Sequence, residues 1–274
     1  MNYSRDFIFN NKEKINNKIN SIIKNGDRGV HLVLDFDRTI TKSTNYLGED
    51  VTTWEILGKH LNKSAKKRYD YLYNKYRPLE VKNKIRLKDA MIWWEGILEL
   101  YKENRLKWSD ISKDVEKRMP IREGVKELFD VCIKKNIPTV IISAGIKDVI
   151  ELWCQRFEVK PSVILSTNLY FDSKGFISGW DKKSLIHILN KKEQGHKEIN
   201  KIKRQRPKAI LIGDHIKDAD MVSGRNNVLR IMVDDPRGED LYRNDEFYNL
   251  ILKKFDLIIK NKTLYPIVDL INKL

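Results

Sequence analysis

The sequence predicts an α/β fold: a doubly wound parallel sheet with a helical cap inserted after the first core strand. From residue 120 onward, short apolar runs alternate with segments of helical periodicity, a pattern typical of parallel strands joined by right-handed crossovers. Earlier in the chain, residues 30–34 are apolar except for His31, as in the apolar run of a fully buried strand. Residues 41–119 then show helical, aromatic-rich sequence without a convincing strand.

The expected elements can be placed in order. Isoleucines at helical spacing from Ile8 to Ile23 predict a first helix, which Gly26 and Gly29 end. Beyond the cap we expect helices at 123–135, 146–157, 181–192, 195–203 and from about 264, strands at 139–142, 163–165, 209–212, 229–233 and 257–259, and a hairpin at 169–180 that turns at 172–175. The predicted domains are a core of residues 1–40 and 120–274 and a cap of residues 41–119.

Composition excludes several classes of protein. The 274 residues are 41% hydrophobic and 33% charged, which is ordinary for a soluble globular chain. No apolar run approaches the roughly 20 residues of a membrane span, and residues 1–24 lack the apolar core of a secretory signal. Cys132 and Cys154 form neither a disulfide framework nor a metal-binding spacing. We therefore expect a cytoplasmic protein with two reduced core thiols and no membrane partner; the pattern carries no signal for an oligomeric state.

The net charge of +15 raises the question of nucleic-acid binding. Lysines are spread along the whole chain, and the densest basic run, 201–208, contains no aromatic residue for base stacking. This run is predicted to be a solvated loop before a strand. Nucleic acid is therefore not the expected partner, although a positive field would attract an anionic substrate.

The most informative segment is the end of the first core strand, where Asp35 and Asp37 follow the apolar run with one residue between them. Ligands of open α/β sheets bind at the carboxyl ends of such strands. Two carboxylates there repel each other and cost desolvation energy unless a cation or a proton lies between them. The alternative is a turn in which an aspartate only caps the next helix.

Three later segments can complete a site at the same sheet edge. Ser143-Ala144-Gly145 ends a strand before a helix, and a hydroxyl with backbone N–H groups at a helix start can hold a phosphate. A further strand ends in Gly213-Asp214 with Asp218 nearby, and carboxylate oxygens suit Mg²⁺. Lys191 lies between these segments in the sequence and is the best-placed cation for an incoming phosphate.

The order of these segments resembles the four-motif signature of the haloacid dehalogenase superfamily of phosphohydrolases. Over nearly the whole chain, the sequence most resembles the cytosolic pyrimidine 5′-nucleotidase (type III nucleotidase) family. The residues that carry this closer resemblance are 142–149, 185–191, 213–214, 218–221, Tyr46, Gly48 and 79–81. The resemblance implies a Rossmann-like core with a helical cap, and Mg²⁺-dependent hydrolysis of nucleoside 5′-monophosphates, with pyrimidine nucleotides expected.

The resemblance also implies catalytic roles. Asp35 would be the nucleophile that forms an aspartyl-phosphate, and Asp37 would protonate the leaving oxygen and then deprotonate water. Mg²⁺ would be held by Asp35, the backbone carbonyl of Asp37, and Asp214.

Other matching residues would bind the substrate. Ser143, the Ala144 amide and Lys191 would hold the phosphoryl oxygens. Asp218 would act on a water ligand of the metal or orient Lys191. In the cap, Glu80 matches the carboxylate that contacts the nucleobase; an exposed helical glutamate is the equally weighted alternative.

The cap departs from the family pattern at three places. Trp93-Trp94 stands where the family has Glu followed by Trp, Leu98 replaces an expected polar residue, and Trp54 stands where the family usually has Cys. An aromatic set could stack a base, but large apolar residues at helical spacing more often pack a core.

Two other functions remain open at this point. One is hydrolysis of another small phosphomonoester, such as phosphoserine or a sugar phosphate, by an enzyme of the same superfamily. The other is nucleic-acid binding through the basic surface, which would show steep salt dependence without phosphatase activity.

Overall fold

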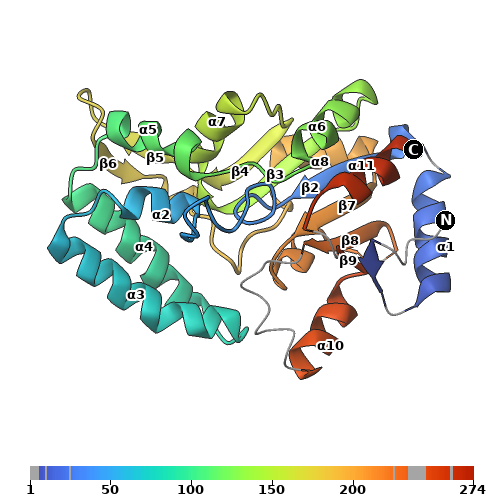
Figure 1. Ribbon diagram of the computed structural model, residues 1–274, viewed down its shortest axis with the longest axis horizontal. Helices are drawn as coiled ribbons and strands as arrows, with labels where there is room; N and C mark the ends of the chain where they lie inside the picture. Colours follow the sequence, from blue (N-terminus) through green and yellow to red (C-terminus); the bar gives the residue numbers. More distant parts are fainter. Residues whose placement is uncertain (1–5, 10, 25, 225, 234–244, 260–261) are drawn as a thin grey trace.

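The computed structural model describes residues 6–9, 11–24, 26–224, 226–233, 245–259 and 262–274. The remaining residues of the predicted core domain lie outside this description. A seven-stranded sheet occupies the centre of the molecule (Figure 1), with strand order β1-β9-β8-β7-β2-β3-β4. All neighbouring strands are parallel except β1, which pairs antiparallel with β9. The predicted α/β fold with a parallel sheet is confirmed.

The strands are β1 (Phe7–Ile8), β2 (Val30–Leu34), β3 (Thr139–Ile146), β4 (Val163–Thr167), β7 (Lys208–Gly213), β8 (Val228–Val233) and β9 (Leu257–Ile259), with β5 (Leu169–Phe171) and β6 (Ile177–Trp180) in a separate hairpin. The helices are α1 (Lys12–Ile23), α2 (Thr53–Gly58), α3 (Lys63–Val81), α4 (Leu87–Glu103), α5 (Trp108–Arg118), α6 (Val125–Lys134), α7 (Lys147–Arg156), α8 (Lys197–Gln205), α10 (Asp245–Lys254) and α11 (Tyr265–Asn272). None of the described helices is long and apolar enough to cross a membrane.

The sheet buries both of its faces, as a doubly wound fold requires. In β2, Leu32 and Leu34 pack in one apolar cluster with residues of α1, α6, α7 and α11. Val33, which points to the opposite face because strand side chains alternate, packs in a second cluster with residues of α8 and α10. Every residue of β2 is buried, His31 included, which explains why the other four residues of the strand are all apolar.

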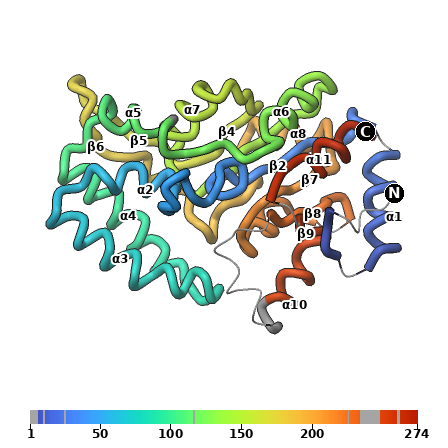
Figure 2. The backbone as a smooth tube through the Cα atoms, in the orientation of Figure 1, coloured from blue at the N-terminus to red at the C-terminus, as the bar shows by residue number. Residues whose placement is uncertain are grey.

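Helices α2–α5 lie between β2 and β3 in the chain. Figure 2 shows them at one end of the molecule, with α3 and α4 running side by side. Their apolar residues join the cluster on one face of the sheet; Tyr69, Leu98 and Tyr101 are almost completely buried there.

Two helix predictions are wrong. Residues 181–192 form only a short 3-10 turn, Lys182–Ser184, followed by a loop. The Asn190 side chain accepts from the His187 N–H (2.7 Å) and donates to the Leu185 carbonyl (2.8 Å). Such side-chain bonds compete with helical backbone pairing, and they hold the loop that carries Lys191.

Ile8 does not belong to the first helix, because it pairs with Ile258 in β1. The helix begins after Asn11, whose side chain caps it by accepting from the Lys14 N–H at 2.9 Å.

The basic run at 201–208 is also not the predicted loop, since residues 201–205 are helical. Ile199, fully buried on α8, anchors this segment to the sheet, and Lys203 pairs with the buried Glu193 at 2.5 Å. Cys132 and Cys154 are free and buried, as predicted, and burial raises the pKa of each thiol to about 12.

Candidate active site

Three adjacent central strands place the predicted site residues at one edge of the sheet. Leu34 of β2 pairs with Ile212 of β7 on one side and with Ile141 of β3 on the other. Asp35, Ser143 and Asp214 follow these positions by one or two residues, so they come together at the carboxyl ends of the strands. The close approach here requires a glycine at 213, because a Cβ there would lie 2.4 Å from the Asp218 Cβ.

Asp35, Asp214 and Asp218 form a compact group of carboxylates. One oxygen from each lies within 4.8 Å of the others. The hydroxyl of Thr39 lies 3.3 Å from Asp35 Oδ2 and 3.4 Å from Asp214 Oδ1. Hard oxygen donors of this kind fit Mg²⁺, so the residues present are compatible with the predicted metal.

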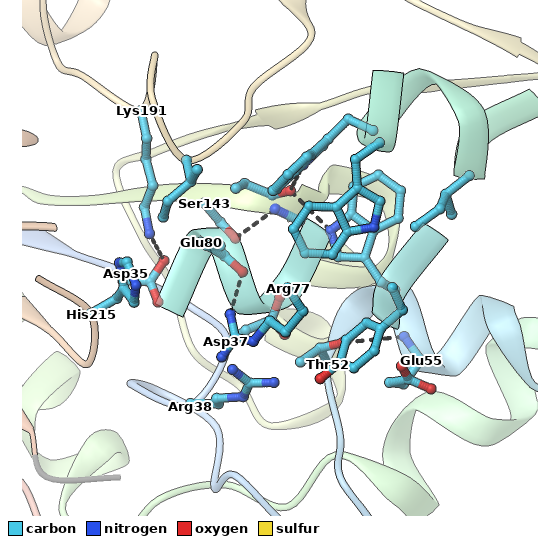
Figure 3. A pocket seen from close by; sticks show the side chains of 18 of the residues that line it. Asp35, Asp37, Arg38, Thr52, Glu55, Arg77, Glu80, Ser143, Lys191 and His215 are labelled. Atoms are coloured by element: carbon cyan, nitrogen blue, oxygen red, sulfur yellow. Dashed lines mark hydrogen bonds and ion pairs between the residues drawn. The ribbon is translucent and has the colours of Figure 1, made fainter. Parts of the chain in front are cut away.

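Lys191 lies between two of these carboxylates. Its ammonium donates to Asp35 Oδ1 and, at 2.7 Å, to Asp218 Oδ1, and Figure 3 shows the side chain pointing toward Asp35. Only 4% of Lys191 is exposed, and Asp218 is fully buried. Burial alone would lower the pKa of Lys191, but Asp218 and Asp35 raise it above the ordinary value. Burial also raises the pKa of Asp35 above its ordinary value, and the charge of Lys191 offsets only part of this rise.

Asp37 has a different environment from Asp35. Its two oxygens accept from the Thr53 N–H (2.8 Å) and the Thr53 hydroxyl (2.9 Å) at the start of α2. Burial, reinforced by the negative charge of Asp35, raises the pKa of Asp37 to about 7. A carboxyl group with this pKa can both donate and accept a proton near neutral pH.

The segment 143–145 forms a bent continuation of β3 rather than the end of the strand, since its register against β4 shifts between Ile142 and Ile146. Ser143 Oγ accepts from the Gly145 N–H at 3.0 Å. The Ala144 carbonyl accepts from two indole N–H groups, those of Trp54 (3.0 Å) and Trp94 (3.1 Å). The peptide between Ala144 and Gly145 is thus held in a single orientation beside Asp37.

A pocket opens above these strand ends. It encloses about 820 Å³ of space not filled by protein atoms, part of it open to solvent. The floor includes Asp35, Asp37, Ser143, Lys191 and Asp214. The inserted helices contribute the aromatic residues Trp54, Tyr69, Tyr73, Trp93 and Trp94.

These aromatic residues belong to both the core and the pocket. Trp93 and Trp94 are each 6% exposed, and their rings meet edge-to-face with centroids 4.6 Å apart. Leu98, in contrast, is fully buried and does not line the pocket. Trp93 and Trp94 therefore pack in the core and line the pocket at the same time, so core packing does not exclude contact with a base.

Glu80 also lines the pocket, and the alternative of an exposed glutamate is wrong because only 7% of it is exposed. Its carboxylate pairs with Arg77 one turn earlier on α3 (Figure 3). Burial opposes ionisation of Glu80, but Arg77 and His215 lower its pKa below the ordinary value.

The structure adds to the site three residues that the sequence prediction did not include: Thr53, which holds Asp37, and the pocket-lining Glu55 and His215. Thr53 follows the helix-capping Thr52, and its position could have been suspected from the Thr-Thr before an apolar run. Glu55 accepts from the Tyr69 hydroxyl at 2.8 Å, and burial raises its pKa. His215 directly follows Asp214 and lines the pocket; nothing in the sequence indicated that its side chain would face this space.

Comparison with known proteins decides the family. The model of the pyrimidine 5′-nucleotidase (UMPH-1) family matches residues 38–273. The chain belongs to this family. The sequence-based prediction of a 5′-nucleotidase-type enzyme, a phosphoric monoester hydrolase of the haloacid dehalogenase fold, is thereby confirmed.

Relatives and solved structures agree with this membership. The 7-methylguanosine phosphate-specific 5′-nucleotidase of Rattus norvegicus is 31% identical over 245 residues, which cover 84% of this chain and 81% of the relative. The namesake from Drosophila melanogaster is 30% identical over 218 residues, 75% of this chain and 68% of the relative. The crystal structure of cytosolic 5′-nucleotidase IIIB bound to cytidine matches with a TM-score of 0.81 at 25% identity, over 98% of this chain and 94% of that one. A substrate-bound phosphoserine phosphatase, at 15% identity and a TM-score of 0.60 over 88% and 97% of the two chains, shares the fold.

Proposed function

We propose that this enzyme hydrolyses nucleoside 5′-monophosphates in a Mg²⁺-dependent reaction that passes through an aspartyl-phosphate on Asp35. The observation that carries the proposal is the arrangement of Asp35, Lys191 and the two further carboxylates at the strand ends, directly below an aromatic-lined pocket. Such a floor suits a phosphate, and such walls suit a nucleoside. Family membership and the nucleotidase relatives support the same substrate class.

The proposed reaction has two steps. The Asp35 carboxylate attacks phosphorus while the bond to the ribose 5′-oxygen breaks, and Asp37 gives its proton to that oxygen. Asp37 then takes a proton from water as the water attacks the aspartyl-phosphate, which releases inorganic phosphate and restores Asp35. The hydrogen bonds from Thr53 hold Asp37 in place for both proton transfers.

The phosphoryl oxygens would be held by Ser143, the Ala144 amide and Lys191, which also offset the developing negative charge. Asp35, the Asp37 carbonyl and Asp214 would hold Mg²⁺, whose positive charge offsets the repulsion between two anions. Asp218 orients Lys191 through their direct ion pair. Between the two roles considered for Asp218, this contact favours positioning of the lysine.

We further propose that residues 41–119 act as the cap domain over a core of residues 1–40 and 120–274. In this arrangement Glu80 accepts hydrogen bonds from the base, and Trp54 and Trp93 contribute aromatic surface. Several relatives are named for 7-methylguanosine phosphate, so the predicted pyrimidine preference must be compared directly with that substrate. A cytoplasmic location remains part of the proposal, supported by the reduced buried thiols.

Release of inorganic phosphate from a panel of substrates tests the proposal. The panel holds cytidine, uridine, guanosine and 7-methylguanosine 5′-monophosphates, with phosphoserine and a sugar phosphate for comparison. We expect nucleotide hydrolysis with Mg²⁺ and none after removal of metal by EDTA. Hydrolysis confined to the non-nucleotide esters, or no hydrolysis at all, would contradict the proposed substrate class.

A matched pair of variants tests the nucleophile. Asp35→Asn should abolish turnover, because the amide is nearly isosteric but lacks the attacking charge. Asp130→Asn, which changes an exposed aspartate on α6, should leave turnover unchanged. Full activity of Asp35→Asn would exclude the covalent mechanism.

A further inference from the structure

His215 carries a hydrogen-bond donor that no described residue uses. Its Nδ1 lies 3.2 Å from the Lys217 backbone N–H and accepts from it. A ring nitrogen that accepts has no proton, so the neutral imidazole must carry its proton on Nε2. Nε2 is buried, and it has no hydrogen-bond partner among the described residues.

A buried donor of this kind calls for an explanation, because the great majority of buried polar groups are paired. His215 lines the proposed substrate pocket (Figure 3). The backbone bond from Lys217 holds the ring, so that the free nitrogen is presented in one orientation. The missing partner is therefore expected to be an acceptor on the molecule that fills the pocket.

The place of His215 in the pocket indicates which part of a nucleotide would supply that acceptor. The residue before it, Asp214, belongs to the carboxylate group at the phosphate end. On the other side, the Glu80 carboxylate from α3 lies close enough to interact with the imidazole electrostatically. His215 thus lies between the phosphate end and the residue proposed to contact the base, where a nucleoside 5′-monophosphate has its sugar.

We propose that His215 is a substrate-binding residue whose Nε2–H donates a hydrogen bond to a ribose hydroxyl of the nucleotide. This inference rests on the proposed nucleotidase function and adds sugar recognition to it. His215 makes the enzyme select nucleotides that carry this hydroxyl over analogues that lack it. A substrate without that hydroxyl leaves the buried donor unpaired, which is the costly case for a hydrogen-bonding site.

The first test needs no variant. The value of kcat/KM is measured for cytidine 5′-monophosphate and for its 2′-deoxy and 3′-deoxy analogues, and the same comparison is made with 7-methylguanosine 5′-monophosphate. Removal of one of the two hydroxyls, 2′ or 3′, should lower kcat/KM about tenfold, which is the usual effect of losing one hydrogen bond to a buried donor. Equal values for all three sugars would overturn the inference.

Two substitutions then assign the effect to Nε2. In His215→Gln, the side-chain amide can reach the Nε2 position and donate, so the preference for the hydroxyl should remain. In His215→Asn, the amide oxygen can still accept from the Lys217 backbone N–H, but the side chain is too short to reach the sugar. The nucleotide and its deoxy analogue should then have about equal kcat/KM values. Lys217→Ala keeps the backbone donor and serves as the control with an unchanged preference.

The outcomes separate this inference from the proposed function. A wild-type enzyme that releases no phosphate from any nucleotide refutes the nucleotidase function itself. An active enzyme whose sugar preference is the same in wild type and His215→Asn refutes only the role of His215. Retention of the preference in Lys217→Ala together with its loss in His215→Asn supports it.

Discussion

Replacement of Lys191 by methionine provides the sharpest test of the site's electrostatics. Lys191 is 4% exposed and forms ion pairs with Asp35 and Asp218, which are themselves buried. Methionine keeps most of the volume but removes the charge, so two buried carboxylates are left facing each other without a cation. Removing one partner from a buried ion pair costs about 3–5 kcal/mol of unfolding free energy.

For a chain of this size, the loss corresponds to a fall in Tm of roughly 6–20 °C. Thermal unfolding followed by circular dichroism in EDTA measures the change without a metal ion to replace the missing charge. Lys192→Met is the matched control, since this neighbouring lysine is exposed and should change Tm by less than about 2 °C.

A second substitution identifies the cause of the loss. Asp218→Asn added to Lys191→Met removes one of the two unpaired charges, so it should recover part of the lost Tm. If Lys191→Met unfolds at the wild-type temperature in EDTA, the carboxylates are not held together by this lysine. If the double variant is less stable than the single one, charge repulsion is not the reason for the loss.

Three further substitutions test neighbouring features. Burial raises the pKa of Asp37 to about 7, so the metal-free folded state binds more protons here than the unfolded state, and its stability falls as pH rises from about 4 to 7. Asp37→Asn should remove this loss of stability, which is worth roughly 4 kcal/mol above pH 7. Parallel profiles of Tm against pH for the two proteins across that window would contradict the prediction. Gly145→Ala places a methyl group 2.3 Å from the Thr53 hydroxyl oxygen and 3.0 Å from Asp37 Oδ2, so kcat should fall about tenfold or more. The control Gly179→Ala, whose nearest contact lies at 3.9 Å, should leave kcat unchanged, and equal kcat values for the two variants would refute the prediction. Glu80→Gln should alter the ranking of bases in kcat/KM, since only a base with a suitably placed donor can hydrogen-bond to this carboxylate. Equal losses for all bases would show that the base is recognised by other residues.

The core strands were predictable because local and global signals agree in them. The strand before Asp35 is apolar on both faces, and the structure buries both faces. Since parallel strands end at the same edge, the order Asp35, Ser143, Asp214 was enough to predict that these residues meet. Lys191 was selected from its place in the sequence, and the structure pairs it with Asp35.

Contacts between distant segments were beyond the sequence. Residues 185–191 have a sequence pattern typical of a helix but form a loop, because the Asn190 side chain hydrogen-bonds to the His187 N–H and the Leu185 carbonyl. The contact between Thr53 and Asp37 depends on how the inserted helices return to the strand ends. Likewise, the free Nε2 of His215 could be recognised only once its other nitrogen was seen to be engaged.

Asp35 and Asp37, just after the carboxyl end of β2, differ in the groups that stabilise their negative charge. Burial raises the pKa of Asp35 too, but its pairing with the cation of Lys191 offsets part of that rise and so favours the ionised, attacking carboxylate. Asp37 accepts hydrogen bonds from the neutral N–H and hydroxyl of Thr53, and its raised pKa keeps a proton available near neutral pH. Two carboxylates in different environments can take opposite roles in one reaction. The difference between Asp35 and Asp37 therefore supports the proposed assignment of nucleophile and proton donor, and it explains why exchanging either residue for its amide should impair turnover for a different reason: loss of the attacking charge at Asp35 and loss of proton transfer at Asp37.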